Sequence, residues 1–382
     1  MVIAASQLTR IRFTLLMAAG TAILASVAGP VPVSAQGTRL WTQSRIEEFE
    51  KGTPQGVALA SDGTLREAPG LKEILTTPSS FVWSVAADKT GTVFLGTSSP
   101  ASVLRVSADG KLFTLFETKD LSVQVARLGP DGALYAATLP SGKVFRLNAN
   151  STSKQDESSA TVIFDPATMP SGPQKPQDAK DGDEKAAAKD SSKSHYVWDM
   201  TFDSAARLYI ATGGPGAVYR VDTGKPGAAP ELFFKSDEGH IRALAWDRNG
   251  NLIAGSDGSG LVYRISPEGK GYVLFEAPRR EIPAIAIGAN GTIYAASVGD
   301  KARNPLPPLP VQGNGVVTFT VVQPGSLQAA NASASAPDGT EIYALKEGQA
   351  PRKIWTGKDE VVYALAARAD GLLALTGNRG RV

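Results

Sequence analysis

The residues of this sequence that could carry catalytic chemistry are few and scattered. The chain has two histidines, His195 and His240, and no cysteine among its 382 residues. Without cysteine, disulfides, thiolate metal sites, a cysteine nucleophile and a lipid-modified N-terminal cysteine are all excluded. The two histidines also lack the short spacing that a histidine metal site requires. The sequence therefore shows no recognisable metal-binding motif, and we expect neither histidine to have a metal-binding role.

Motifs for covalent or phosphate chemistry give the same result. The sequence contains no GxSxG elbow, no P-loop and no GxGxxG stretch between a strand and a helix. Two glycine-rich stretches, 213–216 and 256–260, recur at matching places of a longer repeat. Such recurrence is typical of turns rather than phosphate cradles, and we lean toward a protein that is not an enzyme.

The best candidate ligand site is a group of aromatic and charged residues near the beginnings of predicted strands. Its members are Trp83, Trp198, Asp199, His240 and Arg242. If these strands line a central channel, Asp199, His240 and Arg242 form its entrance. Two structural alternatives remain open: Asp199 caps a turn, and the tryptophans belong to the core.

The strands that carry these residues belong to an internal repeat. Six segments share an apolar strand, a turn and a second apolar strand, and they begin at Val82, Val123, Val197, Ile241, Ile282 and Val362. In five of them a glycine stands nine residues after the start, preceded by Asp, Asn or Thr. Asp-Gly or Asn-Gly between apolar runs predicts a tight hairpin of type I′, which needs positive φ at both central residues.

Two further strands follow most of these hairpins, for example 102–106 and 112–117, and hairpin starts recur about every 41 residues. Four strands at this period predict the blade of a β-propeller rather than a helical solenoid. Second strands such as VFLGT and LYAAT are apolar at nearly every position. Both of their faces must therefore be covered, as they are between neighbouring blades.

Arginine recurs at one position of the third strand in four units, as Arg105, Arg146, Arg220 and Arg264. A ring of cations could bind anions. Equivalent positions of different blades are spread around a ring rather than converging, so we expect each arginine to cover its own blade or pair locally.

The two ends of the repeat region are complementary. Residues 56–75 resemble a third and a fourth strand, and residues 362–382 supply a first and a second strand. We therefore predict an all-β, six-bladed β-propeller closed by N- and C-terminal half-blades, which leaves no open sheet edge. The alternative is a fragment of a larger propeller protein, because the chain stops where the next third strand would begin.

Two insertions interrupt the repeat. Residues 165–195 are rich in Lys, Asp, Ala, Pro and Ser, and they predict a disordered loop because they cannot bury enough apolar surface. Residues 300–339 begin with a proline-rich arm, and they are either a lid or contact arm or a decorated surface loop.

The first 35 residues have the pattern of a secretory signal peptide. Arg10 and Arg12 precede an apolar run, and 33–35 reads Val-Ser-Ala, so we expect cleavage after Ala35. The run is shorter than the ~20 residues that span a bilayer, which disfavours an uncleaved anchor. We expect an exported protein, periplasmic or extracellular and away from the membrane after cleavage, with a lead-in over 36–55 and the propeller over 56–382.

Charge narrows the range of partners. The chain carries 39 basic and 37 acidic residues, a net charge of +2. No basic cluster interleaved with aromatic residues is present, so we do not expect a nucleic-acid partner. A small molecule, a glycan or a protein remains as the ligand class, and we expect a monomer.

Units such as VWDMTFDSAARLYIATGGPGAVYRV resemble the repeats of the broad NHL and SMP-30/gluconolactonase-like group of propellers, and those of secreted bacterial WD40-like repeat proteins. The resemblance implies a six-bladed propeller fold. Lactonases of that group bind a divalent metal in the channel through Glu, Asn and Asp, a set without a match in this sequence. Two hypotheses follow: a binding propeller without a cofactor, and alternatively a metal-dependent lactonase-like hydrolase using Ca²⁺ in the channel.

Overall fold

The computed structural model describes residues 42, 48, 52, 55–59, 64–68, 73–169, 196–300, 339–369 and 371–377. The chain divides into two compact units, Met1–Glu73 and Ile74–Val382. The predicted signal peptide 1–35, its cleavage site and most of the lead-in 36–55 lie outside the described residues. Within the described part, no helix is long and apolar enough to cross a membrane.

The second unit is built from four-stranded antiparallel blades. Blade 1 has β3 (Phe81–Ala87), β4 (Val93–Ser98), β5 (Ser102–Val106) and β6 (Leu112–Glu117), and blade 2 has β7 (Ser122–Leu128), β8 (Leu134–Leu139), β9 (Val144–Leu147) and β10 (Thr161–Phe164). Blade 3 has β11 (Tyr196–Phe202), β12 (Arg207–Gly213), β13 (Ala217–Asp222) and β14 (Glu231–Lys235), and blade 4 has β15 (His240–Trp246), β16 (Leu252–Asp257), β17 (Leu261–Ile265) and β18 (Gly271–Glu276). Blade 5 has β19 (Glu281–Ile287), β20 (Ile293–Val298), β21 (Thr340–Leu345) and β22 (Arg352–Gly357), and a last hairpin has β23 (Val362–Arg368) and β24 (Gly371–Thr376).

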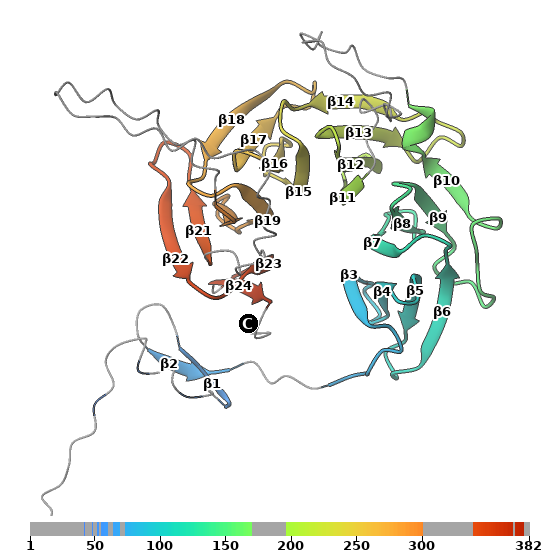
Figure 1. Ribbon diagram of the computed structural model, residues 1–382, viewed down its shortest axis with the longest axis horizontal. Coiled ribbons are helices and arrows are strands. Elements are labelled where there is room, and N and C mark those ends of the chain that lie inside the picture. The colour runs from blue at the N-terminus through green and yellow to red at the C-terminus, as the bar shows by residue number, and fades with distance from the viewer. Residues whose placement is uncertain are drawn as a thin grey trace, which may run out of the picture. The chain divides into compact units, whose positions relative to one another are not determined.

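Figure 1 shows how these blades are arranged within the second unit. The first strand of each blade lies innermost, the later strands follow outward, and the blades succeed one another around a common axis in chain order. Single residue pairs link neighbouring blades, for example Ser98 with Ser122 and Gly213 with His240. The predicted propeller fold is confirmed, whereas the number of six blades stays a prediction.

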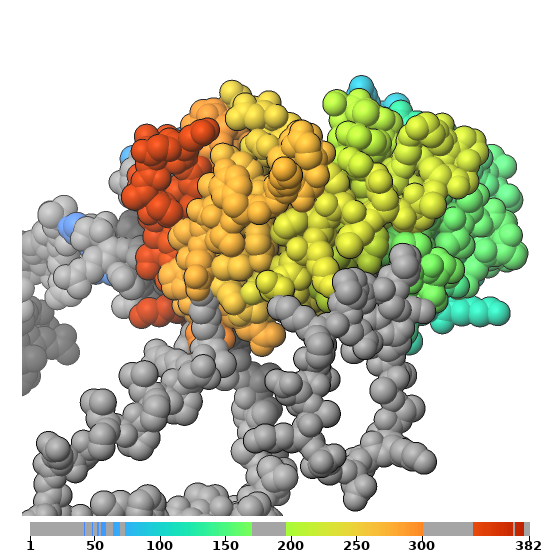
Figure 2. Space-filling view, turned by 90° about the horizontal axis from the view of Figure 1, so that it is seen from above, coloured from blue at the N-terminus to red at the C-terminus, as the bar shows by residue number. Residues whose placement is uncertain are grey.

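The hydrophobic core lies between the blades rather than within one sheet. Between blades 3 and 4, Tyr209 and Val218 pack with Ile241 and Leu252 in one buried cluster. Matching clusters join the other neighbouring pairs of blades, and Figure 2 shows these blades packed side by side. In blades 2–5 the second strand is therefore apolar on both faces because a neighbouring blade or hairpin covers each face, as the sequence predicted.

The hairpin turns differ from the predicted type I′ geometry. In blade 2, Gly132 has a φ of 73°, but Asp131 before it does not take a positive φ. Five residues rather than two separate β7 from β8, and Gly132 N donates to Gly129 O. Asp131 Oδ1 instead accepts the N–H of Ala133 at 3.1 Å, so its side chain braces the turn. In blade 3, which lacks the glycine, Ala206 adopts a φ of 62°.

The two ends that would seal the ring each form a short antiparallel pair. In the first unit β1 (Val57–Leu59) pairs with β2 (Leu65–Glu67), and in the second unit β23 pairs with β24. Each end thus contains the two strands expected of a half-blade. Closure of a six-bladed ring by these half-blades stays a prediction.

Val82 provides a test of that closure. Its equivalents in the other first strands are fully buried: Val123, Val197, Ile241, Ile282 and Val362. Val82 itself is 43% exposed within the arrangement described. A closing blade would cover it, so V82D is expected to lower the free energy of unfolding by several kcal/mol, about as much as V123D, because a charge would be buried without a partner. Urea unfolding of both variants tests whether a closing blade covers Val82. A V82D protein as stable as the parent would contradict closure of the ring.

The start of the predicted disordered insertion 165–195 is ordered. Pro166–Thr168 form a short 3₁₀ helix, η1, and Asp165 caps it by accepting the N–H of Ala167 at 2.9 Å. Pro166 is the buried residue of this turn. The prediction of disorder from residue 165 onward is wrong for 165–169, and residues 170–195 lie outside the described part. Residues 301–338 of the predicted long loop 300–339 also lie outside the described part.

Candidate functional site

The first strands of the blades share a β-bulge near their beginnings. The pairing register shifts between Val82 and Ser84 in β3, and at the matching place in β7, β11, β15, β19 and β23. The residues released from the ladder include Trp83, Gln124, Trp198, Arg242 and Tyr363. A bulge re-aims its side chain and recurs next to binding sites. We call the end of the second unit that carries these bulges the bulge face.

Blades 3 and 4 contribute an interlocked set of side chains to this face, here named the Trp198 cluster: Tyr196, Trp198, His240 and Arg242. The rings of Tyr196 and Trp198 stack with centroids 5.4 Å apart and planes 19° apart. The Arg242 guanidinium lies over the Trp198 ring at 3.8 Å, in cation–π geometry. Trp198 Nε1 donates to His240 Nδ1 at 3.1 Å. Three partners therefore fix the orientation of one indole.

Arg242 is in turn held by the next blade. Its Nε donates to Glu281 Oε1 at 2.6 Å, and both side chains are about three-quarters buried. Beside this pair, Arg280 donates to Asp257 at 2.8 Å. The cluster thus extends over blades 3, 4 and 5 and has a charged border on one side.

The hydrogen bond from Trp198 determines the protonation state of His240. An indole N–H can only donate, so Nδ1 must be the accepting nitrogen and the proton of the neutral ring sits on Nε2. Burial lowers the pKa of His240, and Arg242 and Arg280 lower it further, while Asp257 and Glu281 act in the opposite direction. His240 is therefore neutral at neutral pH and offers Nε2–H as a donor.

Acid is expected to weaken the fold through His240. Because the pKa of His240 is lowered on folding, the unfolded chain takes up the proton at a higher pH than the folded chain does. The stability that neutral His240 contributes is therefore complete above about pH 6.5, and it is lost as the pH falls through the lowered pKa. His240→Asn keeps a hydrogen-bond acceptor but cannot titrate, so the stability of this variant should depend less steeply on pH. Thermal unfolding midpoints recorded between about pH 7.5 and 5 measure this pH dependence, with Tyr272→Ala as the control. Equal slopes for parent and His240→Asn would show that another group is responsible.

Gly213 makes room for the Trp198–His240 contact. It pairs with both Tyr196 and His240, and an added Cβ would collide with Trp198 Nε1 and His240 Nδ1. In blade 1 the matching position is Ser98, whose hydroxyl accepts the N–H of Trp83 at 2.9 Å. The absence of a side chain at 213 lets the indole reach the next blade.

Asp199 follows Trp198 but serves different partners. Its Oδ1 pairs with Arg127 Nη2 at 2.7 Å, and its Oδ2 accepts the N–H of Leu244 at 2.9 Å. Arg127 lies on β7 and Leu244 on β15, so this carboxylate connects the first strands of three successive blades. Its geometry is that of a structural tie.

The five residues proposed from the sequence are therefore only partly brought together. Trp198, His240 and Arg242 form one cluster, Asp199 is engaged between blades, and Trp83 lies two blades away on β3. Sequence reasoning missed Tyr196 and Glu281, although the aromatic residue before Val82 and Val197 repeats as Phe81 and Tyr196. Whether any of them binds a ligand stays a prediction.

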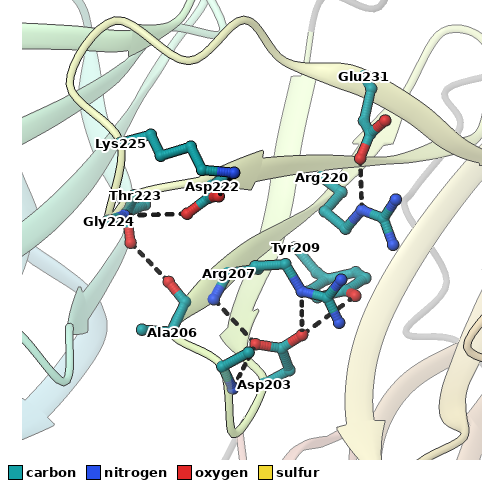
Figure 3. Close-up of polar contacts among 11 residues, drawn as sticks. Asp203, Ala206, Arg207, Tyr209, Arg220, Asp222, Thr223, Gly224, Lys225 and Glu231 are labelled. Carbon is teal, nitrogen blue, oxygen red and sulfur yellow. Dashed lines mark hydrogen bonds and ion pairs between the residues drawn. The ribbon is translucent and has the colours of Figure 1, made fainter.

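Three of the four recurrent third-strand arginines pair with a carboxylate of their own blade. Arg146 binds Asp131, Arg220 binds Glu231 and Arg264 lies 3.5 Å from Asp247, each within its own blade. Arg105 donates to backbone carbonyls at 149 and 151 in blade 2. Figure 3 shows the Arg220 pair beside the Asp203 turn of blade 3. These arginines do not converge on an anion site.

Both insertions begin or end near the bulge face. Tyr196, which follows the insertion 165–195, belongs to the Trp198 cluster, and Val298, just before the loop 300–339, pairs with Glu281. The role of 300–339 as a lid or contact arm stays a prediction.

Metal ligands do not gather in the described part of the chain. No group of three or more His, Cys, Asp or Glu side chains there could hold a metal ion. The lactonase-like alternative and its Ca²⁺ stay untested.

Comparison with known protein families identifies one WD40-like repeat in the chain. Residues 232–264 match the WD40 family model, described as the WD domain, G-beta repeat, over a stretch running from β14 into β17. A search of curated proteins found no match.

Several solved structures are similar in outline. Virginiamycin B lyase from Staphylococcus aureus is 12% identical, with 83% of each chain covered and a TM-score of 0.48. A candidate 6-phosphogluconolactonase from Bacteroides uniformis is 14% identical over 84% of this chain and 83% of that chain, with a TM-score of 0.49. The extracellular domain of a candidate one-component system from B. thetaiotaomicron is 11% identical over 79% of this chain and 33% of that one, with a TM-score of 0.46. Likenesses this distant say nothing about what the chain binds.

Proposed function

We propose that this β-propeller with WD40-like repeats is an exported binding protein that takes up a saccharide on the Trp198 cluster. The proposal joins the secretory pattern of residues 1–35 to the geometry of the bulge face. It assigns no catalytic step to the site.

The observation that carries the proposal is that Trp198 is held in place before any ligand arrives. Tyr196 stacks on it, Arg242 lies over it and His240 accepts its N–H. Ordering a side chain on binding costs about 0.5–1.5 kcal/mol, so a preorganised cluster retains that free energy for the ligand. Tryptophan, tyrosine and arginine are also the residue types that dominate binding free energies.

The chemistry of the cluster favours a neutral, hydroxyl-rich ligand with a flat apolar face. Tyr196 is 39% exposed and supplies a ring face. His240 Nε2–H is a donor, and the Arg242–Glu281 pair adds donors and acceptors at the border. A sugar ring combines an apolar C–H face with hydroxyl groups on its edge. Because Arg242 is already neutralised by Glu281, the cluster lacks the free cation that an anionic ligand would need.

Trp198→Ala is expected to weaken saccharide binding at least ~30-fold, equivalent to about 2 kcal/mol for a central aromatic anchor. Titration calorimetry against a panel of neutral oligosaccharides, peptides and metabolites measures it. Tyr272→Ala is the control, because Tyr272 is an exposed aromatic residue outside the Trp198 cluster, 54% exposed on the outer strand β18. Unchanged affinity in Trp198→Ala contradicts the proposed site, and hydrolysis of a lactone or ester by the parent protein contradicts a purely binding role.

A further inference from the structure

Blade 1 repeats the aromatic pair of blade 3. Phe81 and Trp83 on β3 occupy the positions of Tyr196 and Trp198 on β11, with the same bulge after the intervening valine. Their rings stack with centroids 6.0 Å apart and planes 29° apart. Phe81 is 58% exposed and Trp83 is 50% exposed. The bulge face thus carries two stacked aromatic pairs, one on each side of blade 2.

The pair in blade 1 is complete within its own blade. Trp83 Nε1 donates to Ser98 Oγ at 2.9 Å, so the indole is oriented without help from a histidine of the next blade. The bulge residue of blade 2 is Gln124, where blade 4 has Arg242. An amide both donates and accepts hydrogen bonds and carries no charge. The surroundings of Trp83 therefore fit the hydroxyl groups of a neutral sugar as well as those of Trp198 do.

We propose that Phe81 and Trp83 form a second saccharide subsite, and that the ligand is a neutral polysaccharide chain long enough to engage both aromatic pairs. This inference rests on the proposed function of the Trp198 cluster. Sheets that pack face to face lie about 10 Å apart, so pairs two blades apart are separated by no more than roughly 20 Å. A disaccharide covers one pair, and a chain of several sugar residues reaches both.

Two weak subsites bound by one chain reinforce each other. Binding at the second site becomes intramolecular, and the combined affinity can exceed either site alone by about 10²–10⁴-fold. The structure therefore predicts a steep dependence of affinity on chain length. A single site would show affinity that levels off once its own few sugar residues are filled.

The test compares disaccharides with chains of about eight sugars, long enough for the estimated span, from cellulose, xylan and chitin ladders. Trp83→Ala is expected to lower long-chain affinity about 10–100-fold, because it removes most of the affinity gained by linking the two subsites, while a disaccharide still binds at the Trp198 cluster. Trp83→Phe keeps a ring and should retain most long-chain affinity. Thermal midpoints and circular dichroism of each variant establish that the fold is intact, and Tyr272→Ala is the control.

The outcomes separate the two proposals. If Trp83→Ala leaves long-chain affinity unchanged while Trp198→Ala lowers it, the second subsite is wrong and the proposed function stands. If Trp83→Ala abolishes disaccharide binding altogether, the two pairs act as one site and the inference is overturned. If no saccharide binds, or only proline-rich peptides do, both proposals fail.

Discussion

Asp199→Ala is expected to lower the free energy of unfolding by about 1–3 kcal/mol, since it removes a largely buried carboxylate and leaves its hydrogen-bond donors without an acceptor. The Asp199 side chain is 14% exposed and pairs with Arg127 at 2.7 Å. It also accepts the backbone N–H groups of Leu244 and Met200. One substitution thus removes bonds that connect blades 2, 3 and 4.

A graded series distinguishes charge from hydrogen bonding. Asp199→Asn keeps an acceptor for Leu244 but loses the charge opposite Arg127, so its loss of stability should fall between those of the parent and alanine. Asp109→Ala is the matched control, because Asp109 forms an exposed ion pair with Lys111 and should leave the unfolding midpoint unchanged. Urea unfolding followed by fluorescence gives the values. Equal stability of Asp199→Ala and the control would show that this carboxylate does not hold the blades together.

Gly213→Ala is expected to abolish binding at the Trp198 cluster and to lower the free energy of unfolding by about 1–3 kcal/mol, as an extra methyl group in a packed site does. The new Cβ would occupy the space in which Trp198 Nε1 meets His240 Nδ1. Either the indole or the imidazole must turn away. If the indole turns, its stacking with Tyr196 and Arg242 is lost as well.

Gly371→Ala is the control for this substitution. Gly371 also lies in a second strand, its φ is not positive, and an added Cβ would meet nothing within 4 Å. It should leave both saccharide affinity and stability near those of the parent. Calorimetric titration and thermal unfolding of the two variants measure the difference. Full binding by Gly213→Ala would show that the Trp198–His240 contact is not needed for the site.

Local patterns were enough to predict the blades. A short apolar strand, a bend at glycine and a second apolar strand are encoded within about 16 residues, and their recurrence places equal positions at the same end of successive blades. For that reason Trp198, His240 and Arg242 could be grouped from sequence alone. Turn geometry was less accessible: in blades 1, 2, 4 and 5 only the glycine of the turn takes a positive φ, because the connection is longer than the two-residue turn that was predicted.

The details of the site were beyond local patterns. Trp198 and Asp199 are adjacent, yet the bulge at Trp198 directs the two side chains to different partners. Their partners are distant in sequence: His240 is 42 residues from Trp198, and Arg127 is 72 residues from Asp199. No spacing rule connects residues so far apart, because which side chains meet depends on how whole blades pack.

The sequence by itself determined that the chain forms propeller blades and that aromatic and charged residues stand at the beginnings of the first strands, since strand, turn and burial patterns are local. Only the tertiary structure decided that Trp198 reaches His240 across the space left by Gly213, and that Asp199 pairs instead with Arg127 and with the N–H of Leu244. Those outcomes depend on contacts between blades, which arise only when the packed sheets bring distant residues within bonding distance.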